Sequence, residues 1–188
     1  MDFARLYNEG MSNYILIKPD ISYMQQIKEY REEFIKCGSS FDGTTDLKKY
    51  EDIEKWILET KLYESEETCP PLMSLAYQYL YIDEESKQVV GMIQIRTKAM
   101  SHSFLREYGG HIGYSVLPSR RNEGIGSKML KDCLSLCKNE YKLDKVLVTC
   151  LKSNEASRRI ILSNKGIYEK DVFYKPENEY LERYWIEL

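Results

Sequence analysis

The stretch His111-Ile-Gly-Tyr-Ser-Val-Leu-Pro-Ser-Arg-Arg-Asn-Glu-Gly-Ile-Gly-Ser-Lys-Met-Leu130 decides the fold of this chain. Its first part has the composition of a strand, and Pro118 ends that strand because proline cannot donate a hydrogen bond to a ladder. The second part is a basic, glycine-rich turn that opens an amphipathic helix. The stretch therefore predicts a strand–turn–helix unit with unpaired amides at the start of the helix.

The turn Arg121-Asn-Glu-Gly124-Ile-Gly126 suits a ligand that carries phosphate. Glycine permits a positive φ and a close approach of the backbone, and the first amides of a helix lie at the positive end of its dipole. Arg120, Arg121 and Lys128 would add positive charge. A Walker A loop needs a different glycine spacing, and a dinucleotide-binding GxGxxG needs glycine where Met129 stands. An ordinary strand-to-helix turn with solvated arginines remains the alternative.

Hydrophobic periodicity predicts the other elements. Strands are expected at 14–18, 75–82, 89–96, 109–117, 145–151, 167–174 and 180–187, and helices at about 20–37, 46–63, 122–138 and 154–164. The first helix should bury Ile21, Met24, Ile27, Tyr30, Phe34 and Ile35, and the second Leu47, Tyr50, Ile53, Ile57 and Leu58. This order predicts an α/β fold with a mixed sheet of about seven strands, flanked on both faces by about four helices. The unit from 109 to 151 should form a parallel crossover.

Length and composition favour one domain that spans residues 1–188. The net charge of −3 argues against general binding of nucleic acid, which needs a clustered basic surface. No apolar run approaches the roughly 18 residues of a membrane span, and the first residues lack the pattern of a signal peptide. Five cysteines without a CxxC pair predict a reduced, cytoplasmic protein, and two histidines offer little for a metal site.

Three motifs, in this order along the chain, resemble the GNAT superfamily of N-acetyltransferases. Ile112-Gly-Tyr-Ser-Val-x-Pro118 resembles its fourth strand, Arg121-x-x-Gly124-x-Gly126 its acyl-CoA-binding motif, and Asn154-x-x-Ser157 its later Asn-x-x-Ala/Ser motif. Gly109-Gly-His-Ile-Gly-Tyr-Ser-Val116 and Arg183-Tyr-Trp-Ile186 further resemble a bacterial subgroup of predicted acetyltransferases. The resemblance implies a GNAT-like sheet whose fourth and fifth strands splay apart after Leu117.

The resemblance also implies a site for acetyl-CoA as cosubstrate, with no metal. Amides around Arg121, Asn122, Glu123, Gly124, Ile125, Gly126 and Ser127 would bind the pyrophosphate. The backbone of Tyr114, Ser115 and Val116 would pair with the pantetheine arm, and Asn154 and Ser157 would contact that arm or lie near the thioester. The implied reaction is direct attack of a primary amine, from a small molecule or a peptide, on the thioester in a ternary complex. A backbone N–H near Val116 would stabilise the carbonyl oxygen.

The chain departs from the family at the general acid. Many members have a tyrosine seven residues after the asparagine, where this chain has Ile161. Tyr168 and Tyr174 are candidates to replace that phenol. Tyr114 could hold substrate or water, and His111 has a suitable pKa but falls on the opposite face of its strand. Core packing is the alternative for Tyr114, and a structural, hydrogen-bonded histidine is the alternative for His111.

The first two helices and the loops 38–45 and 65–71 are expected to form the wall for the acceptor. Their charged residues would meet a cationic acceptor or face water: Glu29, Arg31, Glu32, Glu33 and Asp42. A non-catalytic module of the same fold, which binds acyl-CoA or a protein, is the alternative function. Neither a nucleic acid nor a membrane is an expected partner, and a monomer or a homodimer fits equally.

Overall fold

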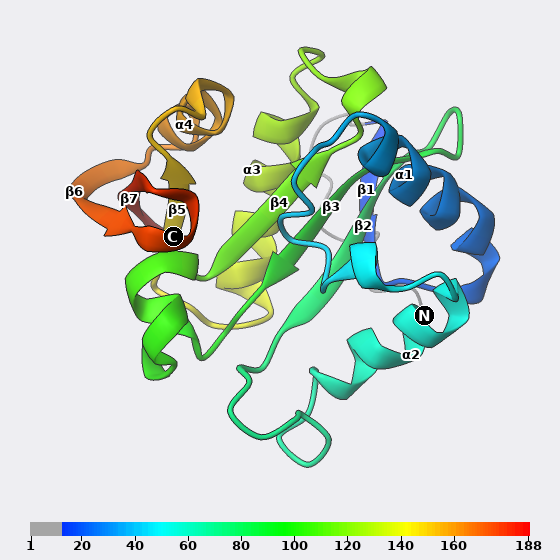
Figure 1. Cartoon of the computed structure of the whole chain (residues 1–188), viewed down its shortest axis with the longest axis horizontal. Helices are drawn as coiled ribbons and strands as arrows, with labels where there is room; N and C mark the ends of the chain where they lie inside the picture. The colour runs from blue at the N-terminus through cyan, green and yellow to red at the C-terminus, as the bar shows by residue number, and fades with distance from the viewer. Residues whose placement is uncertain (1–12) are drawn as a thin grey trace.

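The computed structural model describes residues 13–188 (Figure 1). The strands are β1 Tyr14–Ile17, β2 Tyr77–Asp83, β3 Val89–Ile95, β4 Ile112–Val116, β5 Lys145–Leu151, β6 Ile167–Tyr174 and β7 Glu179–Glu187. The α-helices are α1 Met24–Lys36, α2 Ile53–Leu62, α3 Ile125–Asn139 and α4 Glu155–Ser163. A short π-helix, η5, spans Leu105–Gly109, and a 3-10 turn, η7, spans Lys175–Glu177.

One sheet of seven strands runs in the order β1-β2-β3-β4-β5-β7-β6. Neighbouring strands are antiparallel except for β4 and β5, which are parallel and joined through α3. The mixed sheet expected from the sequence is confirmed. In Figure 1 the strands β1–β4 form one half of the sheet, and β5, β7 and β6 form the other half beside α4.

Each face of the first half of the sheet carries its own apolar core. Side chains from α1 and α2 pack on one face with Leu80, Ile82 and Met92. Side chains of α3 pack on the other face with alternate residues of the same strands, such as Tyr81 and Ile93. This alternation is the period of two that a strand imposes, and it sends Ile112, Tyr114 and Val116 toward α3 and α4.

Some sequence-based expectations for the helices were wrong. The helix expected over 46–63 is a 3-10 turn, Leu47–Lys49, followed by α2, because Asp46 has φ 56° and Tyr50 is extended. Three side chains expected in the core are about half-exposed: Ile21 (58%), Ile35 (47%) and Leu58 (57%). Trp56 is buried instead and donates from Nε1 to Thr44 O at 2.9 Å.

The loop before α2 rests on β4 through two glycines, which generates a prediction. A Cβ at Gly43 would lie 2.1 Å from Gly113 O, and its φ of +69° already disfavours a side chain. Gly38 has a similar φ of +61° but open space around its Cβ. We expect Gly43→Ala to lower the free energy of unfolding by about 3 kcal/mol or more, and Gly38→Ala by only about 1–2 kcal/mol. Urea denaturation of both variants measures the difference, and equal losses would contradict the close contact.

Candidate active site

The ladder between β4 and β5 consists of a single residue pair. Only Ile112 pairs with β5, opposite Val148. His111 N donates to Leu147 O at 2.7 Å, and Leu147 N donates to His111 Nδ1 at 2.8 Å. The splay therefore starts right after Ile112 and not after Leu117.

Beyond this point β4 has a free edge. His111 O accepts from Arg96 N at 2.7 Å and Leu117 N donates to Val90 O at 2.9 Å, so the carbonyl of His111 and the amide of Leu117 point toward β3. Alternation along the strand turns the main-chain groups of Tyr114 and Val116 the other way, toward the diverging β5. No strand among residues 13–188 pairs with them there, although Val116 O accepts from Arg121 Nε at 3.3 Å.

The glycine-rich turn presents a second set of free amides. Gly124 has φ 77° and caps α3. In the described part of the chain, the backbone N–H groups of residues 122–127 have no hydrogen-bond acceptor. Gly126 serves a different purpose, since a Cβ there would lie 2.6 Å from Ile160 Cδ1 and push α3 away from α4.

The basic side chains at this turn differ from the expectation. The Arg120 guanidinium donates to Glu123 and Asp83, so its charge is already neutralised. Lys128 Nζ lies 5.0 Å from the centre of the Tyr14 ring. Two of the three cations expected to meet phosphate therefore have partners within the protein. Arg120 pairs with carboxylates, and Arg121 donates hydrogen bonds to Val116 O and Ser39 Oγ.

A helix-borne carboxylate holds the start of the turn in place. Glu33 on α1 accepts from Ser119 N at 2.6 Å and from Ser119 Oγ at 3.1 Å. This pair ties α1 to the segment that leads into residues 121–127. The role of Glu33 is therefore to position the turn, and it does not face an acceptor.

A cleft of about 730 Å³ joins the turn, the free edge of β4 and the segments beyond it. It is lined by most of the residues expected to bind acetyl-CoA: Tyr114, Ser115, Val116, Arg121, Asn122, Gly124, Ile125, Gly126, Ser127, Asn154 and Ser157. Glu123 does not line it, because its carboxylate is held by Arg120. The geometry thus brings the three motifs of the sequence into one continuous space.

Tyr114 reaches across the cleft to the first turn of α4. Its hydroxyl lies 2.8 Å from Ser157 Oγ, and Asn154 Oδ1 accepts from Ser157 N at 3.0 Å to cap the helix. Burial raises the pKa of Tyr114 well above its usual value, partly offset by the bond to Ser157. The phenol is therefore protonated at neutral pH and can donate a proton.

Two of the other three catalytic candidates, His111 and Tyr168, lie outside the cleft. His111 is buried, and its Nδ1 accepts from an amide that can only donate, so the neutral ring carries its proton on Nε2. Tyr168 is 52% exposed, donates to Asp171 Oδ1 and does not line the cleft. Ile161 is fully buried in the core. Tyr174 does line the cleft, beside Tyr108.

The far end of the cleft differs from the expected acceptor wall. The loop at 38–45 contributes Asp42 and Gly43, but the loop at 65–71 does not line the cleft. The same holds for Glu29, Arg31, Glu32 and Glu33 on α1. Sequence reasoning missed Arg96, Phe104 and Tyr108, which line this end, because nothing in the local pattern of an arginine after a strand reveals that it faces a cleft.

Comparison with known proteins gives one family. The acetyltransferase (GNAT) domain profile matches residues 24–165. No curated protein matches the chain. Among solved structures, the ribosomal-protein-S5-alanine acetyltransferase from Vibrio fischeri has 13% identity and a TM-score of 0.67, and the alignment covers 95% of this chain and 94% of that one.

Two further structures share the fold at similar distance. RimL, a ribosomal α-N-protein acetyltransferase in complex with coenzyme A, has 14% identity and a TM-score of 0.70, with 95% of this chain and 96% of that chain covered. A chimera of the spermidine N-acetyltransferase SpeG from Vibrio cholerae and hSSAT has 11% identity and a TM-score of 0.62, with 94% and 96% covered.

The splayed sheet, the amide-lined turn and the family match together define an acyltransferase fold. The chain belongs to the GNAT acetyltransferase family. Within residues 13–188, no cluster of three or more His, Cys, Asp or Glu side chains could hold a metal ion. In the same residues, no helix is both long and apolar enough to cross a membrane.

The buried His111 predicts a pH dependence of stability. Burial, and secondarily the charge of Arg96, lowers the pKa of His111 from 6.5 to about 4 in the folded state. The unfolded chain therefore binds a proton first as the pH falls below about 6.5, and the folded state loses up to about 3 kcal/mol by pH 4. His111→Asn keeps an acceptor for Leu147 N without the titratable ring.

Urea denaturation between pH 7 and pH 4 tests this dependence. The stability of the wild type should fall toward that of His111→Asn, so that their difference narrows by up to about 3 kcal/mol. A difference that stays constant over this range would show that the imidazole is not held neutral.

Proposed function

We propose that this protein transfers the acetyl group of acetyl-CoA to a primary amine. The observation that carries the proposal is the free edge of β4, with Tyr114 and Val116 unpaired toward β5, continuous with the unpaired amides of residues 122–127. An extended ligand with amide groups can add to such an edge as a strand does, and a diphosphate suits the start of a helix. Coenzyme A has both parts.

The residues present fit this cosubstrate. The N–H groups of residues 122–127 and Arg121 would hold the pyrophosphate, and the backbone of Tyr114, Ser115 and Val116 would hold the pantetheine arm. Asn154 and Ser157 would lie beside that arm at the start of α4. When bound, acetyl-CoA supplies an activated acetyl thioester.

The reaction forms a bond between nitrogen and the acetyl carbon, breaks the bond from that carbon to sulfur, and moves one proton from the amine to the thiolate. We assign the delivery of the proton to Tyr114, with Ser157 as its partner, because the phenol is protonated and lies in the cleft. Asp42 at the far end supplies the negative charge that attracts the ammonium form of an amine, which releases one proton to solvent before its neutral nitrogen attacks the thioester. The N–H of Val116 is free to stabilise an oxyanion.

Binding of coenzyme A depends on a bare backbone at Gly124. A side chain there would project into the open cleft at the site proposed for the pyrophosphate. We expect Gly124→Val to weaken coenzyme A at least tenfold in isothermal titration calorimetry. Gly38→Val is the matched control for strain, because it also has a positive φ and open space. Equal affinities of wild type and Gly124→Val would remove the turn from the site.

Removal of the Tyr114 hydroxyl tests the chemistry. We expect Tyr114→Phe to lower kcat by about 100-fold, within the usual contribution of a general acid, and to leave the affinity for coenzyme A unchanged. Release of thiol from acetyl-CoA with a broad amine panel measures the rate. Tyr168→Phe is the control, because that phenol lies outside the cleft and its loss should change nothing.

The same assay separates the enzyme from a non-catalytic module. Binding of coenzyme A without thiol release in the presence of any amine would favour the module, which Ile161 at the usual phenol position first suggests. Sustained turnover would exclude it. A fully active Tyr114→Phe variant would leave the enzyme in place and move the proton donor elsewhere.

A further inference from the structure

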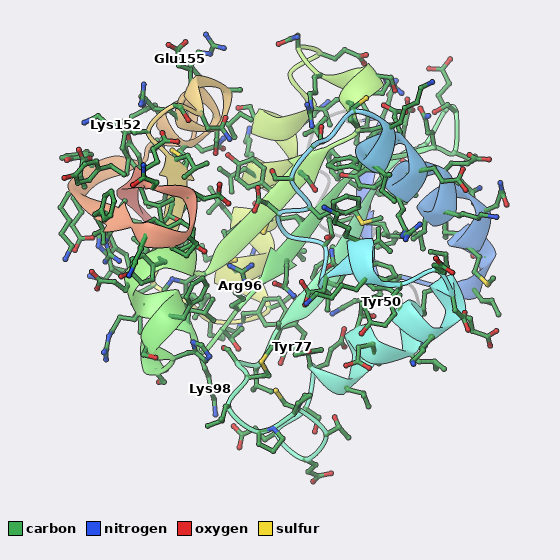
Figure 2. The ribbon with its side chains drawn as sticks, viewed as in Figure 1. Tyr50, Tyr77, Arg96, Lys98, Lys152 and Glu155 are labelled. Carbon is green, nitrogen blue, oxygen red and sulfur yellow. The ribbon has the colours of Figure 1, made fainter. Side chains whose placement is uncertain are left out.

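Arg96 lies at the far end of the cleft, directly after β3. Its guanidinium rests on Gly113 of β4, where a Cβ would come within 2.8 Å of Nη2. Figure 2 shows this side chain near the centre of the molecule, whereas Lys98, two residues further on, lies toward the lower edge. The missing side chain at Gly113 therefore makes room for a cation on the floor of the cleft.

Two of the three nitrogens of Arg96 have partners inside the protein. Nε donates to Gln94 Oε1 and Nη1 donates to Gly109 O, both at 2.8 Å. Nη2 donates to no atom of residues 13–188. One edge of a rigid, planar guanidinium thus remains available to a ligand in the cleft.

Arg96 also lacks a carboxylate partner, unlike comparable arginines of this protein. Arg120, Arg158 and Arg183 pair with Asp83, Glu182 and Glu169 at 3.3, 2.6 and 2.7 Å. No ion pair within 4.0 Å involves Arg96 among the described residues. Burial lowers the pKa of Arg96 to about 10, so it remains a cation at neutral pH. A cation removed from water in this way favours an anion beside it.

Asp42 is the carboxylate whose negative charge acts on Arg96. It forms no ion pair with that arginine, so it can interact with a different group of a ligand. Asp42 lines the cleft together with Arg96 and Tyr114, and its negative charge raises the pKa of both groups. Its Oδ2 accepts from Ser40 Oγ at 2.7 Å, and the side chain is exposed. Arg96 and Asp42 therefore offer one positive and one negative group among the residues that line the cleft, and these match the two charges of a zwitterion.

The pyrophosphate does not explain Arg96. Gly113 and Val116 are three residues apart, which is about 10 Å along a strand, and the turn at 121–127 lies further on in the same direction. Arg96 also lies on the α1 and α2 face with Gly43, whereas Tyr114 reaches α4 on the other face. The anion that meets Arg96 thus belongs to the acceptor.

We propose that Arg96 binds a carboxylate of the acceptor, so that the acceptor is an amine that carries a carboxylate in the same small molecule, such as an α-amino acid. This inference rests on the proposed function. Asp42 would face the ammonium group, on the side of Tyr114. Phe104, Tyr108 and Tyr174, with ring centres 5.3–6.3 Å apart, form an apolar wall for the rest of the molecule.

Matched amines test the inference. Thiol release is measured with a panel of α-amino acids, each paired with the amine that lacks its carboxylate. We expect at least one amino acid to exceed its partner in kcat/KM by tenfold or more. Arg96→Gln should lower kcat/KM for that amino acid at least tenfold more than for its partner amine, and so remove the preference. Lys98→Gln, a control at an exposed cation outside the cleft, should keep it.

A binding measurement tests the inference even if the protein shows no turnover or if one variant does not fold. Calorimetry of the amino acids with protein saturated with coenzyme A should detect binding that weakens tenfold or more in Arg96→Lys, which keeps a charge but loses the planar edge, and in Asp42→Asn, which leaves Arg96 intact. Coenzyme A binding without any acetylation would refute the proposed chemistry, while the calorimetry still decides on Arg96. A wild type that prefers no amino acid over its partner, in rate or in binding, would overturn the inference.

Discussion

The cleft exists because pairing between β4 and β5 stops at Ile112. Two parallel strands normally satisfy each other's amides along their length. Here the imidazole of His111 takes the N–H of Leu147, and Gly110, with φ 64°, lets the two backbones meet so closely that a Cβ would lie 2.5 Å from Leu147 O. The strands leave this junction in different directions, so Tyr114 and Val116 form an open edge inside a sheet instead of at its border. A strand-like ligand is the natural partner of such an edge.

Two halves of a sheet joined at one pair of residues need a second attachment, and the π-helix η5 provides it. Its carbonyls accept from side chains of both halves: Gly109 O from Arg96 after β3, Tyr108 O from Thr149 on β5 at 2.6 Å, and the carbonyls of Arg106 and Glu107 from Arg183 on β7. These bonds also satisfy helix-end carbonyls that have no partner within the helix. The angle of the splay and the position of the aromatic wall are thus fixed by the same contacts.

Most of the fold, and the glycine-rich turn with its free amides, were predictable, because both are determined by local sequence. The strands at 145–151 and 167–174 have the expected bounds, since each apolar run is flanked by turn residues. The turn at 121–127 is one contiguous motif. At the other end of the cleft the sequence named Asp42 and Tyr174 but missed Arg96 and Tyr108, because these residues come from four segments that only the tertiary fold brings together. The expected helix faces were wrong at Ile21, which lies in a 3-10 turn before α1, and at Leu58, because α2 turns Ile53, Trp56 and Ile57 inward and leaves Leu58 on its outer side.

The burial of Ile161 agrees with the proposal that the proton donor is Tyr114 on β4. The α4 helix ends against Gly166, where a Cβ would lie 2.4 Å from Ile161 Cγ2, and Gly166 N donates to Ile161 O. Ile161 is fully buried among core side chains, so a larger tyrosine would overpack this junction. Ser157 lies four residues earlier on α4, on the same side of the helix, and it is there that Tyr114 places its hydroxyl. Under this proposal the proton donor lies one helical turn from the usual position. The core then keeps the aliphatic Ile161, and the protonated phenol of Tyr114 lies in the cleft.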